Sequence, residues 1–279
     1  MLVLKIGGGL TIDRGAFCRD AASLVREGRQ VVLVHGGSAE TDEVSLRLGK
    51  PPRFVTSVSG YRSRLTDEKT MEIFSMVYAG KLNTAYTSLL RQLGVNALGL
   101  SGVDGGLAAA QRKEALKIVE DGRRRVLRGD RSGRIERING SLLRLLLREG
   151  YVPVVSPPAI SRRGEVLNVD GDRMAAAIAG ELGAEVLVMF TDRPGFLRDP
   201  DCEESLIERV SAEDLEEMGE CARGRMRIKL LAAREALDAG VSRVIIADGR
   251  RTESPVRSAL AGEGTVIAAA KSGERAWAR

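Results

Sequence analysis

The sequence predicts an α/β protein built on a mostly parallel sheet with helices on both of its faces. Short apolar runs, most of them rich in β-branched residues, recur along the chain, at residues 2–6, 31–35, 97–100, 152–155, 186–190, 244–247 and 265–268. Segments with helical spacing of apolar residues lie between them, at 13–26, 66–93, 141–148, 172–182 and 225–239. Strands that alternate with helices in this way are typical of parallel sheets that are covered on both faces.

The composition is that of an ordinary globular protein, long enough for one large α/β domain or for two lobes. The chain has 279 residues, of which 43% are hydrophobic and 29% are charged. No apolar run approaches the length of a membrane span and the N-terminus lacks a signal-peptide pattern, so we expect a cytoplasmic protein that does not bind membranes. The three cysteines are far apart and there is one histidine, which argues against a disulfide framework and against a zinc site.

The opening strand contains a lysine that its apolar surroundings do not explain. Lys5 lies within an apolar run that ends in Gly7, Gly8 and Gly9. Glycines let the backbone approach phosphate oxygens, and a lysine supplies a mobile positive charge. A glycine-rich turn after a strand is more often an ordinary loop, so this stretch predicts a phosphate site only together with similar turns elsewhere.

Such turns follow several of the other predicted strands. They are His35-Gly36-Gly37-Ser38, Ser101-Gly102-Val103-Asp104-Gly105-Gly106 and Thr191-Asp192-Arg193-Pro194-Gly195. Ligands of parallel sheets bind at the carboxyl ends of the strands, so these turns predict an extended rim that binds anions. A histidine that closes an apolar strand is more often a buried hydrogen-bonding residue than a base, and His35 is given no catalytic role. The chain has neither a Walker motif nor G-x-G-x-x-G, which argues against a P-loop NTPase, a dinucleotide fold and a protein kinase.

Charged residues at predicted helix entrances are further candidates for the site. Arg62 and Arg64 precede Thr66, which we expect to cap the following helix, and two arginines there suit a bidentate carboxylate clamp. Asp172 stands at the start of a helix rich in small residues, where it is either a ligand or a simple dipole partner. Lys229 lies one turn into a later helix whose N-terminus is suited to nucleotide phosphates.

Positive charge is concentrated in one segment, Gly122 to Arg137. It contains seven arginines against Asp130 and Glu136, a surplus equal to the net charge of +5 of the whole chain. We expect a surface hairpin here. Nucleic-acid binding is a weak alternative, because no aromatic residues are interspersed among the arginines.

Seven stretches, taken in order, identify a family. They are Lys5-Ile6-Gly7-Gly8, His35-Gly36-Gly37, Arg64-Leu65-Thr66-Asp67, Gly80-Lys81-Leu82-Asn83, the run from Gly99 to Gly106, the run from Asn168 to Asp172, and Thr191-Asp192 with Gly195. With them, the chain resembles the amino acid kinases, and among these the acetylglutamate-kinase-like branch, over roughly residues 2 to 268. The resemblance implies a three-layer αβα sandwich with a mainly parallel eight-stranded sheet. It also implies one domain over residues 1–270, with an amino-acid-binding lobe at 1–165, an ATP-binding lobe at 166–270 and a tail at 271–279.

The resemblance implies a reaction in which a side-chain carboxylate attacks the γ-phosphoryl group of ATP and forms an acyl phosphate. A carboxylate is already ionised at pH 7, so no general base is needed, and catalysis depends on alignment and on neutralising charge. Mg²⁺ would be held mainly by the nucleotide phosphates, and no residue is predicted to bind a metal.

The same resemblance assigns roles to individual residues. Lys5 and Lys229 match the two catalytic lysines of the family, and Asp172 matches the aspartate that holds both. The predicted substrate-binding residues are Gly36, Gly37, Ser38, Arg64 and Asn168. The predicted nucleotide-binding residues are Gly7, Gly8, Thr191, Asp192, Gly195, Phe196, Leu197, Gly224 and Met226. The chain departs from the family pattern at Ser38, at Arg193 and at Arg225, which affects the expected nucleotide contacts.

Two groups of enzymes share this framework. One phosphorylates free N-acetylglutamate, and the other phosphorylates α-aminoadipate attached to the small acidic carrier protein LysW. The stretch from Ser59 to Thr66 and the stretch from Arg131 to Ile138 resemble the carrier-linked group, which we favour. Arg131, Arg134 and Arg137 are therefore predicted to bind the carrier.

Three further points remain open at this stage. Glutamate is an alternative to aminoadipate on the carrier, because one methylene in a pocket is worth only ~1–3 kcal/mol. A homodimer is expected, because the N-terminal extension typical of the arginine-inhibited ring form is missing. A catalytically inactive amino-acid sensor is a rival of another class, and the joint presence of Lys5, Asp172 and Lys229 argues against it.

Overall fold

The computed structural model describes residues 1–9, 11–120, 122–222 and 224–268. The predicted tail at 271–279 lies outside these residues. Within them, no helix is both long enough and apolar enough to cross a lipid bilayer.

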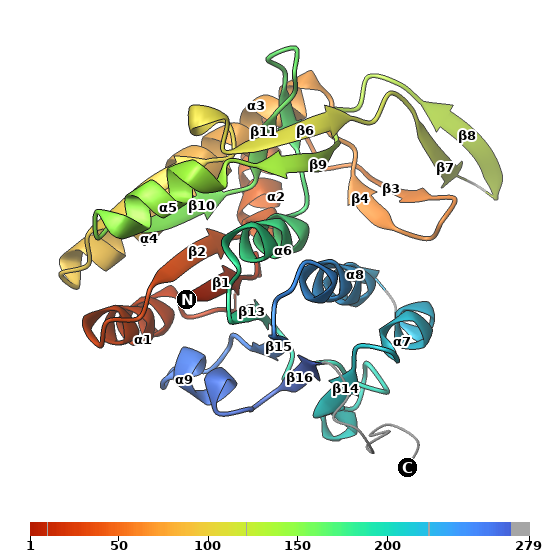
Figure 1. The fold of residues 1–279 in the computed structure, drawn as a ribbon. Coiled ribbons are helices and arrows are strands. Elements are labelled where there is room, and N and C mark those ends of the chain that lie inside the picture. Colours follow the sequence, from red (N-terminus) through yellow and green to blue (C-terminus); the bar gives the residue numbers. More distant parts are fainter. Residues whose placement is uncertain (10, 121, 223, 269–279) are drawn as a thin grey trace.

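A central sheet of eight strands forms the middle layer of the molecule (Figure 1). Its strand order is β14-β16-β15-β13-β1-β2-β10-β5, and every neighbouring pair is parallel except β15 with β16. In chain order the strands are β1 (Leu2–Ile6), β2 (Val31–His35), β5 (Ala97–Ser101), β10 (Val152–Ser156), β13 (Val186–Thr191), β14 (Arg209–Ser211), β15 (Arg243–Asp248) and β16 (Thr265–Ala268). The predicted mainly parallel eight-stranded sheet is confirmed, and β14 is the one strand that the apolar runs did not indicate.

Helices cover both faces of this sheet. On one face lie α5 (Gly140–Arg148), α6 (Gly171–Leu182), α7 (Leu215–Cys221) and α8 (Gly224–Asp238). On the other face lie α1 (Arg14–Arg26), α4 (Asn83–Gln92) and α9 (Pro255–Leu260). Because side chains alternate along a strand, the odd and even residues of β1 face different cores: Val3 packs with α6, whereas Leu2 and Leu4 pack with α1.

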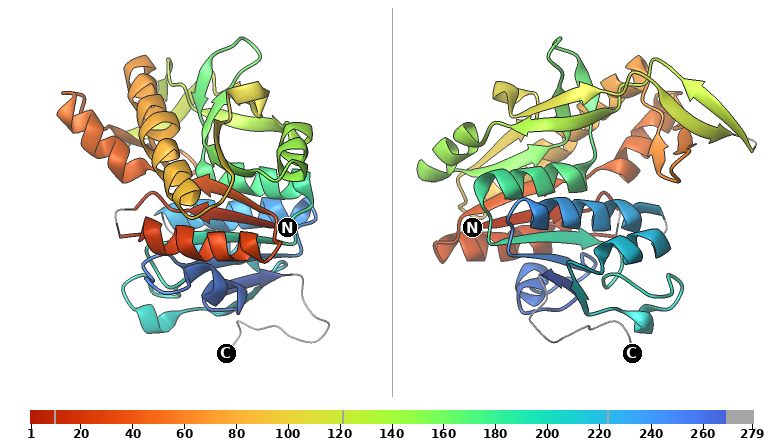
Figure 2. Two further views of the ribbon diagram at one scale, coloured as in Figure 1. Left: turned by 90° about the vertical axis from the view of Figure 1, so that its left-hand side faces the viewer. Right: turned by 45° about the vertical axis from the view of Figure 1, so that its right-hand side comes forward.

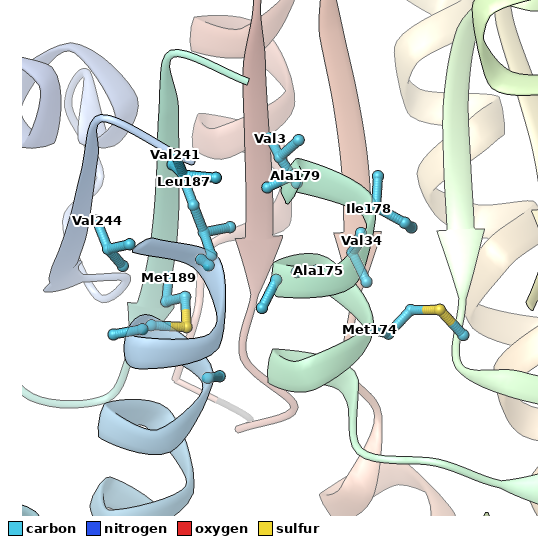
Figure 3. Packing of buried hydrophobic residues seen from close by; sticks show 14 of the residues in the cluster. Val3, Val34, Met174, Ala175, Ile178, Ala179, Leu187, Met189, Val241 and Val244 are labelled. Carbon is cyan, nitrogen blue, oxygen red and sulfur yellow. The ribbon is translucent and has the colours of Figure 1, made fainter. Parts of the chain in front are cut away.

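The helices α6 and α8 lie side by side, and small residues let them approach closely (Figure 2). A Cβ on Gly180 of α6 would lie 2.5 Å from the Cβ of Ala239, so no larger residue fits at this crossing. Ala175 and Ala179 of α6 pack over Val3 and Val34 of the sheet, as Figure 3 shows. This close packing fixes where the first turns of α6 and α8 lie.

Local sequence signals define where several helices begin and end. Asp170 caps α6 by accepting hydrogen bonds from the backbone N–H groups of Asp172 and Arg173, and Gly183 ends it in the left-handed conformation. The predicted cap at Thr66 is wrong, because Asp67 caps α3 (Glu68–Ser75) by accepting from the N–H of Thr70. Thr66 is buried instead, and its hydroxyl donates to the carbonyl oxygen of Arg64.

The single helix expected over 66–93 is divided into three parts. Between α3 and α4 the chain forms a seven-residue π-helix, η1 (Met76–Leu82). π-helical segments inside α-helices often occur at functional sites. In this chain, η1 brings Leu82 and Tyr78 against Gly37, where a Cβ would lie 2.3 Å from the Cδ1 atom of Leu82.

Two four-stranded sheets and several short elements were not predicted. One small sheet has the order β12-β11-β6-β9 and the other β4-β3-β7-β8, and in Figure 2 the β7–β8 hairpin projects from the body of the molecule. Their strands are β3 (Phe54–Ser57), β4 (Arg62–Arg64), β6 (Ala108–Arg112), β7 (Leu116–Glu120), β8 (Arg123–Leu127), β9 (Gly133–Ile138), β11 (Pro158–Ile160) and β12 (Val166–Asn168). The remaining elements are α2 (Ser38–Arg47) and the 3₁₀ turns η2 (Asp104–Gly106) and η3 (Glu203–Ser205).

The arginine segment from Gly122 to Arg137 is not one hairpin, as was expected. Its first three arginines lie on β8, which pairs with β7 in one small sheet, whereas Arg134 and Arg137 lie on β9 in the other. Asp130 separates the two parts. It is buried and accepts hydrogen bonds from the backbone N–H groups of Thr66 and Ser132, so its charge ties the segment to the body of the protein.

Candidate active site

A cavity of about 1760 Å³ opens at the carboxyl ends of β1, β2 and β13. Strand β1 contributes Lys5 and leads into Gly7 and Gly8, and β2 leads into Gly36 and Gly37. The cavity also extends to residues of α6, α8 and the two small sheets. The structure therefore has a large hollow where a parallel sheet of this kind binds ligands.

Two buried lysines share one carboxylate in this cavity. The Nζ atom of Lys5 lies 2.6 Å from Oδ1 of Asp172, and the Nζ atom of Lys229 lies 3.1 Å from each carboxylate oxygen of the same residue. Each of the three residues is no more than 7% exposed. Lys5 comes from β1, Asp172 from the first turn of α6 and Lys229 from the second turn of α8, so the close packing of these elements sets the cluster.

The electrostatics of this cluster follow from burial and from charge. Burial by itself would raise the pKa of Asp172, but the positive charges of Lys229 and Lys5 outweigh it and lower that pKa well below its usual range. Burial lowers the pKa of Lys229, and the charge of Asp172 opposes this effect. In this cluster two ammonium groups share one carboxylate, an arrangement that suits an anionic ligand.

Backbone amides gather beside the lysines. A Cβ on Gly8 would lie 2.5 Å from the amide nitrogen of Gly37 and 2.6 Å from that of Ser38. A Cβ on Gly36 would in turn lie 2.7 Å from the amide nitrogen of Gly8. Side chains are therefore excluded from the space in front of these amides, and the two glycine turns form a cradle that a phosphate oxygen can enter.

The predicted substrate residues Arg64 and Asn168 line the same cavity as the cradle. Arg64 is buried, forms an ion pair with Asp42 and lies over the ring of Phe54. Asn168 ends β12, and its Nδ2 atom donates to the hydroxyl of Thr66 at 2.9 Å. That hydrogen bond orients the amide and directs its oxygen away from Thr66, so the oxygen is available as an acceptor.

Most of the predicted nucleotide residues also line the cavity. These are Gly7, Gly8, Thr191, Asp192, Gly195, Phe196, Leu197 and Met226. The loop after β13 is fixed by the hydroxyl of Thr265, which accepts from the backbone N–H of Phe196 at 2.8 Å. Gly224 does not lie on the cavity wall: it is exposed, begins α8 and has φ 58°.

The three arginines predicted to bind a carrier differ in their surroundings. Arg134 and Arg137 are exposed on β9 and line the cavity. Arg131 is half-buried, and its guanidinium lies 2.8 Å from the Oε1 atom of Glu68. Its backbone donates to the carbonyl oxygen of Thr66 and accepts from the N–H of Asn168, so Arg131 supports the substrate side of the cavity.

Sequence reasoning missed Asp170, Tyr61 and Tyr78, all of which line the cavity. The signal for Asp170 was present, since an aspartate two residues before Asp172 is in position to cap α6. Tyr61 and Tyr78 had no signal, because their places depend on β4 and on the π-helix. His35 is fully buried, as predicted, and burial lowers its pKa to about 4.

The cleft has glycine amides and paired lysines at the carboxyl ends of a parallel αβα sheet. These groups can position a phosphoryl group and neutralise its charge, which defines a phosphoryl-transfer protein. The comparisons specify the class: residues 1–248 match the Amino acid kinase family, and the chain belongs to this family. Membership in a kinase family implies ATP as the phosphoryl donor.

Relatives of known name cover nearly the whole chain. A [LysW]-aminoadipate kinase of Thermus thermophilus is 50% identical over 96% of this chain and 100% of its own length. A protein of the same name from Deinococcus radiodurans is 49% identical over 96% of this chain and 91% of its own length. An acetylglutamate kinase of Methanopyrus kandleri is 41% identical over 96% of this chain and 100% of its own length.

The fold is also similar to that of a solved structure. N-acetylglutamate synthase from Neisseria gonorrhoeae, complexed with coenzyme A and N-acetyl-glutamate, superposes with a TM-score of 0.78 at 28% identity. The match covers 97% of this chain and 59% of that chain, so this chain corresponds to about three fifths of the synthase.

The charge cluster leads to a prediction about stability. We expect Asp172→Asn to lower the free energy of unfolding by about 3 kcal/mol, because it leaves two buried lysines without their anion. Urea denaturation measures the loss. The loss should shrink as the pH rises from 7 to 9. In this range the unfolded variant binds more protons than the folded variant, so raising the pH favours the folded state. Adding Lys229→Met should recover part of the stability, and a double variant less stable than Asp172→Asn would contradict the pairing.

Proposed function

We propose that this protein transfers the γ-phosphoryl group of ATP to the side-chain carboxylate of α-aminoadipate carried on an acidic LysW-type protein. Family membership supports the reaction class, and the names of the Thermus and Deinococcus relatives support the substrate. The observation that carries the proposal is the pair of buried lysines on Asp172, next to the cradle of glycine amides.

In this proposal, Lys5 and Lys229 neutralise charge on the phosphoryl group as it moves between two oxygens. Lys5 comes from β1 and Lys229 from α8, and both ammonium groups contact the carboxylate of Asp172. Asp172 holds both ammonium groups in place and does not accept a proton, since their charges lower its pKa. The amides of Gly37 and Ser38 donate to the phosphoryl oxygens from the cradle.

The amino-acid substrate is assigned to the side of the cavity that contains Arg64 and Asn168. A guanidinium has five N–H donors, so Arg64 retains donors for the α-carboxylate while paired with Asp42. The side-chain oxygen of Asn168 accepts from the amide N–H that joins the amino acid to the carrier, because its Nδ2 atom already binds Thr66. This arrangement suits an acylated amino group better than a free ammonium.

The nucleotide is assigned to the side formed by the loop after β13 and by Met226, within the proposed ATP-binding lobe at 166–270. Mg²⁺, when bound to the phosphates, supplies further positive charge. Among the described residues, no group of three histidine, cysteine or acidic side chains is arranged to hold a metal ion. Gly224 is assigned to the start of α8 and not to a direct nucleotide contact.

The carrier is assigned to the cavity mouth beside Arg134 and Arg137. Within the described part of the chain, neither guanidinium has an ion pair, so both are available to an acidic protein. Such charges raise the association rate more than they tighten the final complex. We further propose a homodimer as the working assembly.

Free N-acetylglutamate is the second candidate substrate. The relative from Methanopyrus carries the name acetylglutamate kinase, and an N-acetyl group presents the same amide to Asn168. The arginines at the mouth have no role with so small a substrate, so we favour the carrier-linked one.

The experiment that tests the function is an ATP-dependent acyl-phosphate assay trapped with hydroxylamine. It compares carrier-linked aminoadipate, carrier-linked glutamate and free N-acetylglutamate. We expect the highest kcat/KM with carrier-linked aminoadipate. Efficient turnover of free N-acetylglutamate alone would favour the second candidate, and no acyl phosphate from any substrate would refute a carboxylate kinase.

Substitution of either lysine tests the catalytic assignment. We expect Lys5→Ala and Lys229→Ala to lower kcat by a factor of about 10² or more with little change in KM, because both act on charge that develops during transfer. Steady-state kinetics on carrier-linked substrate measures this. Near-normal kcat in either variant would remove that lysine from the proposed machinery.

Salt dependence tests the carrier surface. We expect Arg134→Ala with Arg137→Ala to lower kcat/KM for carrier-linked substrate and to flatten its dependence on salt. The Debye length falls from about 8 Å at 0.15 M salt to about 3 Å at 1 M salt. The difference in kcat/KM between wild type and the double variant should therefore vanish at high salt.

The matched control for this test is Arg91→Ala with Arg148→Ala. It removes the same charge from two exposed arginines that do not line the cavity. Arg131 is kept intact, because its contacts support Thr66 and Asn168. Equal losses in the control pair, or equal losses on free and carrier-linked substrate, would contradict a docking role.

A further inference from the structure

Three residues, each from a different signature stretch of the sequence, have no role in the reaction described above, yet they meet at one buried place. They are His35 at the end of β2, Asn83 at the start of α4 and Gly99 in β5. His35 is 0% exposed and Asn83 is 5% exposed. A Cβ on Gly99 would lie 2.1 Å from the Oδ1 atom of Asn83, so only glycine there allows Asn83 to reach into the sheet.

The hydrogen bonds of His35 assign one tautomer to its ring. Nε2 lies 3.2 Å from the Nδ2 atom of Asn83, which also contacts the carbonyl oxygens of Val154 at 2.9 Å and Leu100 at 3.3 Å. An amide nitrogen next to carbonyl oxygens is a donor, so Nε2 must accept. Nδ1 lies 3.1 Å from the carbonyl oxygen of Gly36, which can only accept, so Nδ1 must carry the proton.

The ring is also held from the sides. Tyr86 and Tyr78 stack on it, with ring centroids at 5.2 Å and 6.1 Å. Burial lowers the pKa of the ring to about 4, which agrees with a neutral imidazole at pH 7. The ring therefore has one orientation and one protonation state, and its Nδ1–H is directed at the turn that follows β2.

That turn is the one that supplies the cradle amides. The N–H of Gly36 donates to the carbonyl oxygen of Ile6 at 2.8 Å, and the carbonyl oxygen of Gly37 accepts from Thr41. The carbonyl oxygen of Gly36 lies between these two groups in the chain and accepts a hydrogen bond from Nδ1–H of His35. In a trans peptide the C=O and the next N–H point in opposite directions, so fixing the carbonyl of Gly36 also fixes the direction of the Gly37 N–H.

We propose that His35 is a positioning residue that, anchored by Asn83, fixes the Gly36–Gly37 peptide so that the Gly37 amide faces the transferring phosphoryl group. The role rests on the proposed phosphoryl transfer, but the tautomer and the fixed peptide do not depend on it. A displacement of about 1 Å at a reacting group costs roughly 10²-fold in rate, so loss of the Nδ1–H should lower kcat strongly.

The first experiment reads the tautomer directly. His35 is the single histidine of the chain, so untagged, ¹⁵N-labelled protein gives one pair of imidazole nitrogen signals. We expect the pattern of a neutral ring protonated on Nδ1 at pH 7. A ring protonated on Nε2, or an imidazolium, would overturn the proposal, and this result stands whether or not the protein phosphorylates the expected substrate.

The second experiment separates the two nitrogens by substitution. The side-chain amide of His35→Asn places a donor near the position of Nδ1, whereas that of His35→Gln reaches only the position of Nε2. We expect His35→Asn to keep kcat within about 10-fold of wild type and His35→Gln to lose about 10²-fold. The KM for carrier-linked substrate should change little in both variants, because Arg64 and Asn168 are not touched.

A control for lost packing is Leu90→Ala. Leu90 is buried in α4 and lies in the core under the same face of the sheet, without a place in the cavity. We expect it to lower the melting temperature with kcat close to wild type. If the losses in kcat of both His35 variants merely follow their losses in melting temperature, or if His35→Gln retains more activity than His35→Asn, His35 is only a packing residue and the proposal fails. If wild type itself gives no acyl phosphate while the tautomer is as expected, the proposed function fails and the fixed turn remains.

Discussion

The structure is organised around one carboxylate that holds two buried ammonium groups. Asp172, Lys5 and Lys229 come from α6, β1 and α8, and their separations are 2.6 to 3.1 Å. Burying ions is unfavourable unless partners are close and well placed, so each of these elements constrains the others. The three charges can meet because small residues line the α6–α8 crossing and because β1 is an apolar strand. As a result, the fold tolerates little change around these charges.

The parts of this molecule that were predictable from sequence are those with local signals. Seven of the eight strands of the central sheet are apolar and six of these contain β-branched residues, so the sequence predicted their alternation with helices. Lys5, Asp172 and Lys229 stood out because each is a charge in or beside an apolar element, and the structure brings the three together. Their catalytic role remains a prediction.

The parts that were not predictable depend on contacts between distant segments. The small strands of the outer sheets are three to six residues long, and both sheets depend on pairings between distant segments, β3 with β7 and β6 with β11. Threonine is a common capping residue, but the neighbouring Asp67 caps α3 instead. Thr66 is buried, and its backbone N–H donates to the carboxylate of Asp130. The arginine segment was expected to be one hairpin, since sequence alone did not reveal that Asp130 anchors it between two sheets.

The π-helix between α3 and α4 also has a consequence for how these two helices are oriented relative to each other. In the seven residues Met76–Leu82, each backbone hydrogen bond joins residues five apart in the chain, whereas in an α-helix the residues are four apart. Each residue of an α-helix turns the following side chains by about 100°. Deleting one residue here would allow an ordinary helix to form, yet it would rotate Asn83 away from β5 and β10. The seven residues of this segment therefore set the rotation of α4 relative to α3, on which the position of Asn83 depends.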